Sequence, residues 1–266
     1  MVRDETQSNN NLQVIFTTHS PLLTEIDNFD SIRMVRKIDN DNNPKITKLF
    51  KIEMEKILNR LSVATGKNRH EFTDKTLKAR LHSIMTPWMN EGFFANVVVL
   101  VEGITDRAAI LGVATAMKLD LNAKGITVIP CGGKTSMDRP YIIFDELKIP
   151  IYIAWGGDYK GKNSKPEPNR CLMKLIGKSE EDWPDFIDET ATCLKYNLES
   201  KLKEEIGEDN LKEILSDLCK KFQIPKEDKI PKNPEVISGI MERVMDDNGS
   251  DLFLIKIVNN IINLCK

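Results

Sequence analysis

The segment from Val97 to Asp106 (VVVLVEGITD) constrains the fold of this chain more than any other. Its five consecutive apolar residues are too few to cross a bilayer and are mostly β-branched, which is typical of a buried strand in a parallel sheet. Glu102 follows this strand, and Gly103 permits a tight turn. Apolar side chains then recur at helical spacing from Thr105 to Lys118. The pattern predicts a strand, a turn and a helix with two acids beside the turn, where open α/β sheets bind ligands.

Two further strand patterns follow this unit. Residues 125–130 (GITVIP) predict a strand that runs into a Gly-Gly-Lys turn, and residues 149–155 (IPIYIAW) predict a strand that ends near Asp158. A strand with Glu, a strand with Gly-Gly-Lys and a strand with an acidic end, in this order, resemble the Toprim domain. That domain is the metal-binding catalytic module of topoisomerases, primases and OLD (overcoming lysogenization defect) nucleases. The resemblance implies an α/β fold with a Rossmann-like parallel sheet. From the residues alone, an alternative is that Glu102 is a solvated strand end and Asp106 a first-turn acid favoured by the helix dipole.

The beginning of the chain resembles another part of OLD proteins. Leu12 to Ser20 (LQVIFTTHS) has the pattern of an apolar strand that delivers His19 within Thr-Thr-His-Ser-Pro. This resembles the switch-histidine segment of ABC-type ATPase domains, in which the histidine reaches the γ-phosphate. An ATPase tail before a Toprim domain is the domain order of OLD nucleases, including the nuclease subunit of Gabija-type antiphage systems. A structural role is the alternative for a lone histidine after a strand.

The sequence contains no phosphate-binding loop for ATP. Such a loop needs a glycine five residues before Gly-Lys-Ser/Thr, so that backbone amides wrap the phosphates. Before Gly133-Lys134-Thr135 that position is Val128. We therefore expect this chain neither to bind ATP tightly nor to hydrolyse it alone. ATP would act only in a longer form that contains the ATPase, of which this chain would be a fragment or a natural truncation.

The resemblance also implies a set of site residues. The metal-binding carboxylates it implies are Glu102, Asp106, Asp158 and Glu199. The residues of the adjoining turn are Gly132, Gly133 and Lys134. Lys232 matches a catalytic lysine ahead of a final helix, whose ammonium would stabilise charge that develops on the phosphate. The alternatives are a helix-starting acid at Glu199 and a solvated linker lysine at Lys232.

One position departs from the family pattern. The third Toprim strand of the family ends in Asp-x-Asp, and the alignment places Gly156 at the first Asp and Asp158 at the second. A two-metal site of Mg²⁺ or Mn²⁺ needs several carboxylates, because each ion takes about six oxygen ligands. The retained carboxylates imply one ion and leave the second in question. On this register, Gly156→Asp is expected to restore a ligand and to speed cleavage.

Charge and composition limit the function classes. The 266 residues have a net charge of −2, so DNA binding would depend on local basic clusters. The candidate DNA contacts follow Asp158 and are Lys160, Lys162, Lys165 and Arg170; a solvated loop without a partner is the alternative. No 18-residue apolar run or signal-like start is present, so we expect a cytoplasmic protein without membrane contact. Five cysteines without a Cys-x-x-Cys pair predict neither disulfides nor zinc.

The other patterns are mostly helical. Residues 31–36 and 45–49 predict a hairpin, and helical spacing recurs at residues 51–61, 73–85, 202–218 and 234–245. The chain then divides into a C-terminal remnant of an ABC-type ATPase domain (1–50), a helical connector (51–95), a Toprim catalytic core (96–200) and a helical C-terminal elaboration (201–266).

The resemblance implies cleavage or nicking of DNA that depends on Mg²⁺ or Mn²⁺, in antiphage defence. The enzyme would be a homo-oligomer, with a helicase or another defence protein as a candidate partner. The rival from a different class is a catalytically silent Toprim module that binds DNA or a partner, because Gly156 replaces an expected Asp. A primase or a topoisomerase is a further alternative. A topoisomerase needs a nucleophilic tyrosine module, whereas all four tyrosines lie inside or beside the predicted core: Tyr141, Tyr152, Tyr159 and Tyr196.

Overall fold

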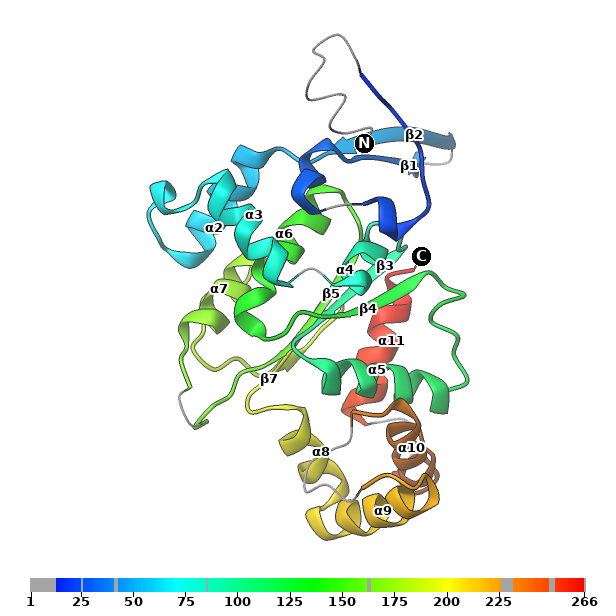
Figure 1. Ribbon diagram of the computed structural model, residues 1–266. Helices are drawn as coiled ribbons and strands as arrows, with labels where there is room; N and C mark the ends of the chain where they lie inside the picture. Colours follow the sequence, from blue (N-terminus) through cyan, green and yellow to red (C-terminus); the bar gives the residue numbers. More distant parts are fainter. Residues whose placement is uncertain are drawn as a thin grey trace.

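A five-stranded sheet forms the centre of the protein (Figure 1). The computed structural model describes residues 13–24, 26–40, 43–84, 86–161, 164–225, 232–248 and 252–265. The strand order is β4-β3-β5-β7-β6, with bounds β3 (Val97–Val101), β4 (Ile126–Pro130), β5 (Ile151–Gly156), β6 (Phe186–Ile187) and β7 (Ala191–Leu194). The strands from β4 to β7 are parallel, and β6 pairs antiparallel with β7 at one edge. The predicted α/β class and its three strands are confirmed.

The two faces of the sheet carry separate hydrophobic cores, because successive side chains of β3 point to opposite faces. Val97, Val99 and Val101 belong to one core, and Val98 and Leu100 belong to the other. The first core is covered by α5 (Ile104–Ala116), α8 (Leu198–Ile206), α9 (Glu208–Lys221), α10 (Pro234–Asn248) and α11 (Phe253–Asn263). The second is covered by α2 (Met54–Thr65), α3 (Asp74–Ile84), α4 (Pro87–Gly92), α6 (Asp138–Glu146) and α7 (Glu167–Leu175). Figure 1 shows α11 and α6 on opposite sides of the sheet.

The N-terminal region contains the predicted hairpin but not the predicted strand. The strands β1 (Arg33–Asn40) and β2 (Asn43–Lys51) pair antiparallel. Residues 13–20, in contrast, form no strand, and Ile15 and Phe16 are 84% and 62% exposed. A strand satisfies its backbone groups only by pairing with another strand, and this apolar segment has no such neighbour among the described residues. The strand prediction for this segment is therefore wrong for the chain as it stands.

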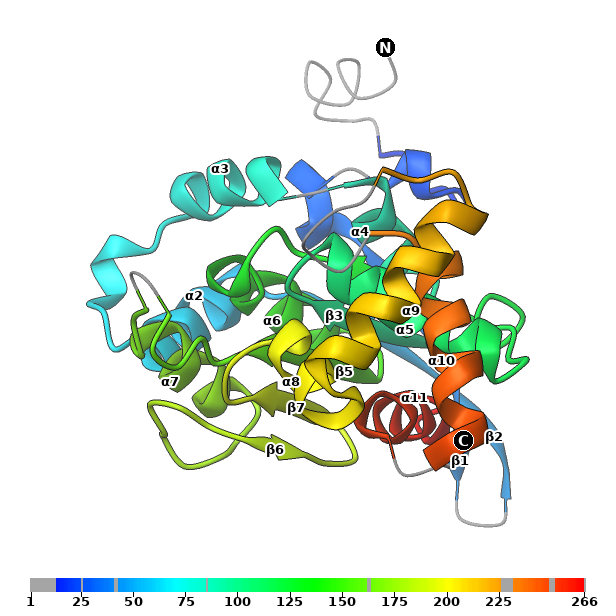
Figure 2. The ribbon, with the colours of Figure 1, turned by 90° about the horizontal axis from the view of Figure 1, so that it is seen from below.

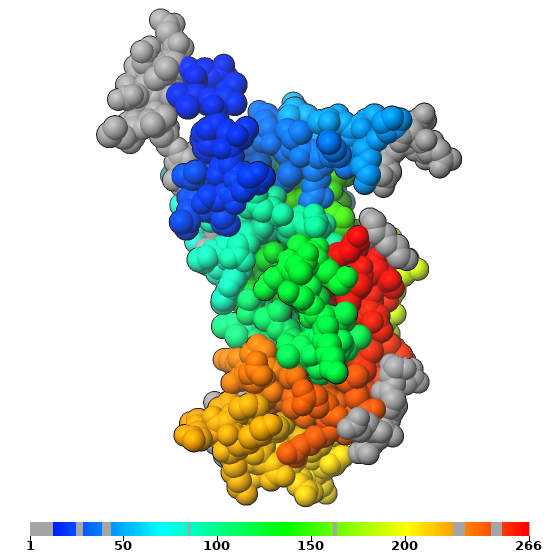
Figure 3. Space-filling model, turned by 90° about the vertical axis from the view of Figure 1, so that its right-hand side faces the viewer, coloured from blue at the N-terminus to red at the C-terminus, as the bar shows by residue number. Residues whose placement is uncertain are grey.

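Arg36 fastens the hairpin to the core. Its guanidinium donates hydrogen bonds to the backbone carbonyls of Ala95 and Lys148, which lie just before β3 and β5. The hairpin thus lies at the amino end of the central strands. In Figure 3 the hairpin and the N-terminal segment are at the opposite end of the molecule from α8, α9 and α10.

The C-terminal helices lie side by side near one end of the sheet (Figure 2). The helical pattern at residues 202–218 is divided between two helices, because Gly207, with φ at 86°, ends α8 and begins α9. The helix predicted from residue 234 is α10. None of the described helices is both long and apolar enough to cross a membrane. All five cysteines are free thiols.

Close packing of α10 on α5 joins this helical region to the sheet. A Cβ atom on Gly112 of α5 would lie 2.5 Å from Ile237 Cβ and 2.5 Å from the Pro234 carbonyl oxygen. Glycine inside a helix is about 1 kcal/mol less favourable than alanine. The close approach of α10 therefore explains why glycine occupies this position despite its low helix propensity.

Gly112→Ala is expected to destabilise the protein. Overpacking of this kind costs about 1–3 kcal/mol, which outweighs the gain of about 1 kcal/mol from helix propensity. The measurement is the free energy of unfolding in urea. Thr115→Ala, at an exposed position of the same helix, is the control and should change stability by less than about 0.5 kcal/mol. A stabilised Gly112→Ala variant would contradict the close packing.

Candidate active site

Two carboxylates lie at the carboxyl end of β3, where the chain turns into α5. Glu102 Oε2 accepts a hydrogen bond from the backbone N–H of Gly156 at 3.2 Å, which ties it to the end of β5. Asp106 Oδ2 accepts a hydrogen bond from the backbone N–H of Gly103 at 2.8 Å and so caps the first turn of α5. Both acids therefore face the edge of the sheet at which ligands of α/β proteins bind.

Burial raises the pKa of both acids above the ordinary carboxyl values. At Glu102 the hydrogen bond from Gly156 and the charge of Lys134 oppose this effect, while the charges of Asp158 and Asp106 add to it. At Asp106 the charge of Asp158 also raises the pKa. Glu102, Asp106 and Asp158 are thus near enough to repel one another, and a further cation beside them would lower the energy of the ionised site.

The Gly-Gly-Lys turn after β4 brings a cation into this group. Gly132 and Gly133 have φ angles of 77° and 130°, in the region that favours glycine. The N–H of Gly133 donates to the carbonyl oxygen of Glu102 at 2.9 Å. The Nζ atom of Lys134 lies 2.7 Å from Asp158 Oδ2, and its side chain is only 10% exposed. Lys134, predicted only as a turn residue, thus forms an ion pair with a predicted metal ligand.

The Lys134 ammonium has two more partners. It donates to the carbonyl oxygen of Gly156 at 2.6 Å and to Asn169 Oδ1 at 3.4 Å. Asn169 lies on α7 and is completely buried, and its side-chain nitrogen donates to the carbonyl oxygens of Gly157 and Asp182. Sequence analysis missed Asn169, because it treated this segment as a loop. No local sequence pattern marks Asn169, because its burial depends on how α7 packs against the loop after β5.

The end of β5 packs tightly against the loop after β7. The backbone N–H of Asp158 donates to the Tyr196 carbonyl oxygen at 2.8 Å, and that of Gly157 donates to the Leu194 carbonyl oxygen at 2.7 Å. A Cβ atom on Gly156 would lie 2.9 Å from the Tyr196 carbonyl oxygen and 3.4 Å from Asn197 Cα. The expectation that Gly156→Asp simply restores a ligand does not fit this geometry, because the new side chain would displace backbone.

Glu199 and His19 make their contacts outside this group. Glu199 lies in the first turn of α8, and its Oε1 atom pairs with Lys203 Nζ at 2.9 Å. His19 is exposed, and its ring centroid lies 6.4 Å from that of Phe94, which precedes β3. It is thus at the amino end of the strand, whereas Glu102 is at the carboxyl end. Within the described ranges, no group of three or more His, Cys, Asp or Glu side chains is arranged to hold a metal ion.

Lys232 is exposed immediately before α10. The start of α10 packs against Gly112, which is separated from Asp106 by about 9 Å of helix. Of the predicted DNA contacts, Lys160 and Lys165 are exposed, and Lys162 lies outside the described residues. The fourth predicted contact, Arg170, lies on α7 and forms an ion pair with Asp182. The roles of these residues stay predictions.

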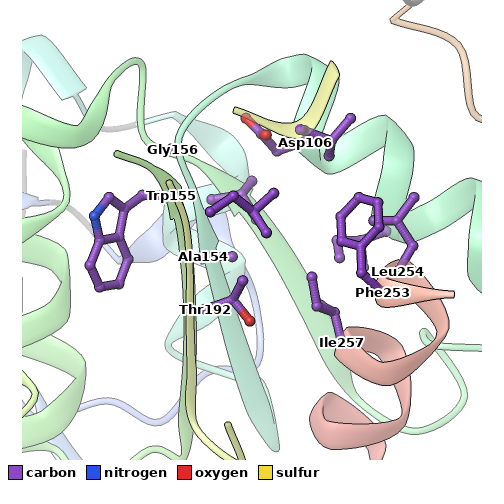
Figure 4. A pocket seen from close by; sticks show the side chains of 12 residues that line it. Asp106, Ala154, Trp155, Gly156, Thr192, Phe253, Leu254 and Ile257 are labelled. Carbon is purple, nitrogen blue, oxygen red and sulfur yellow. The ribbon is translucent and has the colours of Figure 1, made fainter. Parts of the chain in front are cut away.

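An apolar pocket lies beside Asp106 (Figure 4). Its volume is about 350 Å³, including space open to solvent, and its walls come from β3, β5, β7, α5, α8 and α11. The side chains of Phe253, Leu254 and Ile257 line it on α11. The apolar walls keep water away from the Asp106 carboxylate. This loss of hydration disfavours its charged form and so raises its pKa.

The segment that contains Glu102, Asp106, Lys134 and Asp158 is similar to a known protein family. Residues 93–158 match the family described as "Overcoming lysogenization defect protein-like, TOPRIM domain". The chain carries an OLD-like Toprim domain. The matched residues include the β3 acids, the Gly-Gly-Lys turn and Asp158, so the Toprim domain contains the ion pair and the two buried carboxylates.

Relatives of the chain include OLD proteins. It is 28% identical over 171 residues to the OLD nuclease of Thermus scotoductus, an alignment that covers 64% of this chain and 29% of that protein. The C-terminal region of the Xanthomonas campestris pv. campestris OLD protein aligns with a TM-score of 0.41 and 17% identity, over 66% of this chain and 96% of that one. The corresponding region from Burkholderia pseudomallei aligns with a TM-score of 0.39 and 19% identity, over 65% and 97%.

Replacement of Glu102 by Gln should stabilise the metal-free protein at pH 7. Because the folded-state pKa is raised, the stability contributed by protonated Glu102 is complete below about pH 4 and is lost as pH rises through the folded-state pKa. In EDTA at pH 7 we expect Glu102→Gln to raise the Tm by at least about 2 °C. The difference should vanish near pH 4. Glu213→Gln, at an exposed position on α9, is the control.

Gly156→Asp and Gly156→Ala should both lower stability by about 1–3 kcal/mol, since a Cβ atom at this position meets backbone. The control is Gly103→Ala, where the nearest atom to a new Cβ is Asp106 Oδ2 at an ordinary 3.6 Å. Thermal unfolding in EDTA measures the loss of stability, and thermal unfolding in Mg²⁺ measures any stabilisation by a bound ion. An unchanged Tm in EDTA, together with a larger Mg²⁺-induced shift for Gly156→Asp, would instead support the restored ligand.

Proposed function

We propose that this chain is the nuclease portion of an OLD-type enzyme and cleaves or nicks DNA with a divalent metal ion, in antiphage defence. The observation that carries the proposal is the pair of buried carboxylates, Glu102 and Asp106, beside the Lys134–Asp158 ion pair. The match of residues 93–158 to the OLD-like Toprim family and the similarity to an OLD nuclease support it.

The donor atoms fit one Mg²⁺ or Mn²⁺ ion. Mg²⁺ commonly binds through one or two carboxylates, with water and substrate phosphate completing its shell, so a group of three acids is not required. Glu102 and Asp106 would hold the ion. Its positive charge would stabilise their ionised forms and so offset the effect of burial on their pKa. When bound, such an ion polarises the phosphodiester and lowers the pKa of the attacking water.

In this proposal Lys134 would supply a fixed positive charge in place of a second metal ion. Its ammonium contacts the Asp158 carboxylate and the Gly156 carbonyl oxygen. Gly156 and Asp158 are the first and last residues of the segment that the resemblance aligns with Asp-x-Asp. A nearly buried ammonium stabilises negative charge on a phosphate more strongly than a solvated one, because water screens it less. Lys232 would act on the leaving oxygen, and Lys160 and Lys165 would contact neighbouring phosphates.

One feature favours the second candidate function, a silent Toprim module that binds DNA or a partner. Asp158 is already paired with Lys134 at 2.7 Å, so its carboxylate has less charge to offer a metal ion. Such a module would bind nucleic acid without turnover. The two candidates differ in whether Glu102 is needed for a chemical step.

The wider assembly belongs to the same proposal. The chain covers 29% of the length of the OLD nuclease that it resembles. Hydrolysis of ATP would require an ATPase domain joined to residues such as His19, and a homo-oligomer with a helicase or another defence protein would complete the system. Isothermal titration of ATP into this chain is expected to show no micromolar binding.

Cleavage of supercoiled plasmid DNA in Mg²⁺ or Mn²⁺ tests the main proposal. Glu102→Gln and Lys134→Met should each slow nicking by about 10²–10³-fold, the usual effect of removing one group that stabilises charge in the transition state. Lys212→Met, which removes a surface lysine paired with Glu208, is the matched control and should leave the rate unchanged. Titration calorimetry should give one Mn²⁺ per chain.

The outcomes separate the two candidates. Cleavage that depends on metal and disappears in Glu102→Gln supports the nuclease. Retained DNA binding without any metal-dependent cleavage by the unaltered chain supports the silent module instead.

A further inference from the structure

Three aromatic side chains meet beside Asp158. The ring centroid of Tyr159, the next residue in the chain, lies 5.7 Å from that of Trp183 and 5.6 Å from that of Tyr196. The three residues come from the loop after β5, the segment before β6 and the loop after β7. We call Tyr159, Trp183 and Tyr196 the aromatic cluster. The Tyr159 ring is tilted by 58° to the Trp183 ring and by 57° to the Tyr196 ring.

Two lysines flank the aromatic cluster. Lys195 Nζ lies 4.8 Å and Lys160 Nζ lies 5.3 Å from the centroid of the Tyr159 ring, within the range of cation–π contacts. Both lysines are exposed, and Tyr196 keeps 42% of its surface open to solvent. Since the chain as a whole has a net charge of −2, a cationic and aromatic surface beside an acidic site is a local feature.

The backbone fixes the aromatic cluster relative to the site. The N–H of Asp158 donates to the Tyr196 carbonyl oxygen at 2.8 Å, and the N–H of Tyr159 donates to the Lys195 carbonyl oxygen at 3.0 Å. These bonds join the loops after β5 and β7, so the backbones of Tyr159 and Tyr196 are fixed relative to Asp158. Lys134 in turn holds Asp158 through its ion pair. A ligand on the cluster would therefore lie next to the reacting phosphate of the proposed function.

The exposed Tyr196 ring, backed by two half-buried rings and flanked by lysines, suits an unpaired nucleotide. Single-stranded nucleic acids bind to platforms on which bases stack on aromatic side chains while lysines contact the phosphates. In a continuous duplex each base is already stacked on its neighbours and cannot reach such a platform. We propose that the aromatic cluster stacks one unpaired base of the DNA strand at the site, so that single-stranded or frayed DNA binds more tightly than continuous duplex. This inference rests on the proposed function for the identity of the substrate.

Binding measured without catalysis tests the inference. The probes are a fluorescent 12-nucleotide oligothymidylate and a blunt duplex of the same length, each titrated with the full chain in EDTA. The unaltered chain should bind the single strand more tightly. Tyr196→Ala should weaken that binding by about 5- to 150-fold, the equivalent of one stacked base, and should change duplex binding little. Tyr196→Phe keeps the ring and should bind as the unaltered chain does.

The matched control is Phe94→Ala. Phe94 is 36% exposed and precedes β3, at the end of the strand away from Glu102, so its removal should not affect the single strand. Lys195→Ala should weaken binding of both probes and reduce the salt dependence, because a phosphate contact does not distinguish them. Thermal unfolding of Tyr196→Ala verifies that the exposed substitution leaves the fold intact.

Equal affinity of Tyr196→Ala and the unaltered chain for the single strand would overturn the inference, as would a duplex bound as tightly as the single strand. Plasmid cleavage by the unaltered chain together with either result would keep the nuclease and reject the stacking platform. A Tyr196-dependent preference for the single strand in a chain that cleaves nothing would keep the stacking platform and reject the nuclease.

Discussion

The register of β3 against its two neighbours determines the arrangement of the site. Val101 lies opposite Pro130 of β4 and Ala154 of β5, and both pairings are parallel. All three strands therefore end at the same edge of the sheet. Glu102 follows Val101 by one residue, and Lys134 and Asp158 each lie four residues beyond their strand partner. A shift of one residue in either pairing would move Lys134 or Asp158 away from Glu102. The buried side chains at this edge would then lose the opposite charge that now lies beside them.

Electrostatics and stability oppose each other at this edge. Burial raises the pKa of Glu102 and Asp106, so their ionised forms destabilise the folded protein when no cation is near. The Lys134 ammonium offsets part of this cost through Asp158 and through its charge at Glu102. The two cores on either side of the sheet supply the stability that holds the carboxylates in place. In the proposed nuclease, acids that are fixed in place before the ion arrives would favour the binding of a cation.

Local sequence patterns predicted the sheet well and the contacts between its strand ends poorly. The run Val97 to Val101 is a buried parallel strand with the predicted bounds, because continuous apolar residues suit a strand that is covered on both faces. The segment from residue 13 to residue 20 has a similar pattern and no strand, because a strand also needs a partner, which no local pattern reveals. The Lys134–Asp158 pair and the aromatic cluster join residues from separate loops. They depend on the strand order, which was not available from the sequence.

Gly156 shows how one residue can serve packing and chemistry together. The resemblance to Toprim domains predicts an aspartate at this position, where the sequence has glycine. In the structure the absence of a Cβ atom lets the loop after β7 approach, with the Tyr196 carbonyl oxygen only 2.9 Å from the position of that atom. The same approach allows the N–H of Asp158 to bond Tyr196 and the N–H of Tyr159 to bond Lys195. On the register that the resemblance implies, an aspartate at residue 156 would therefore do two things at once: it would add a carboxylate, and its Cβ atom would separate the two loops.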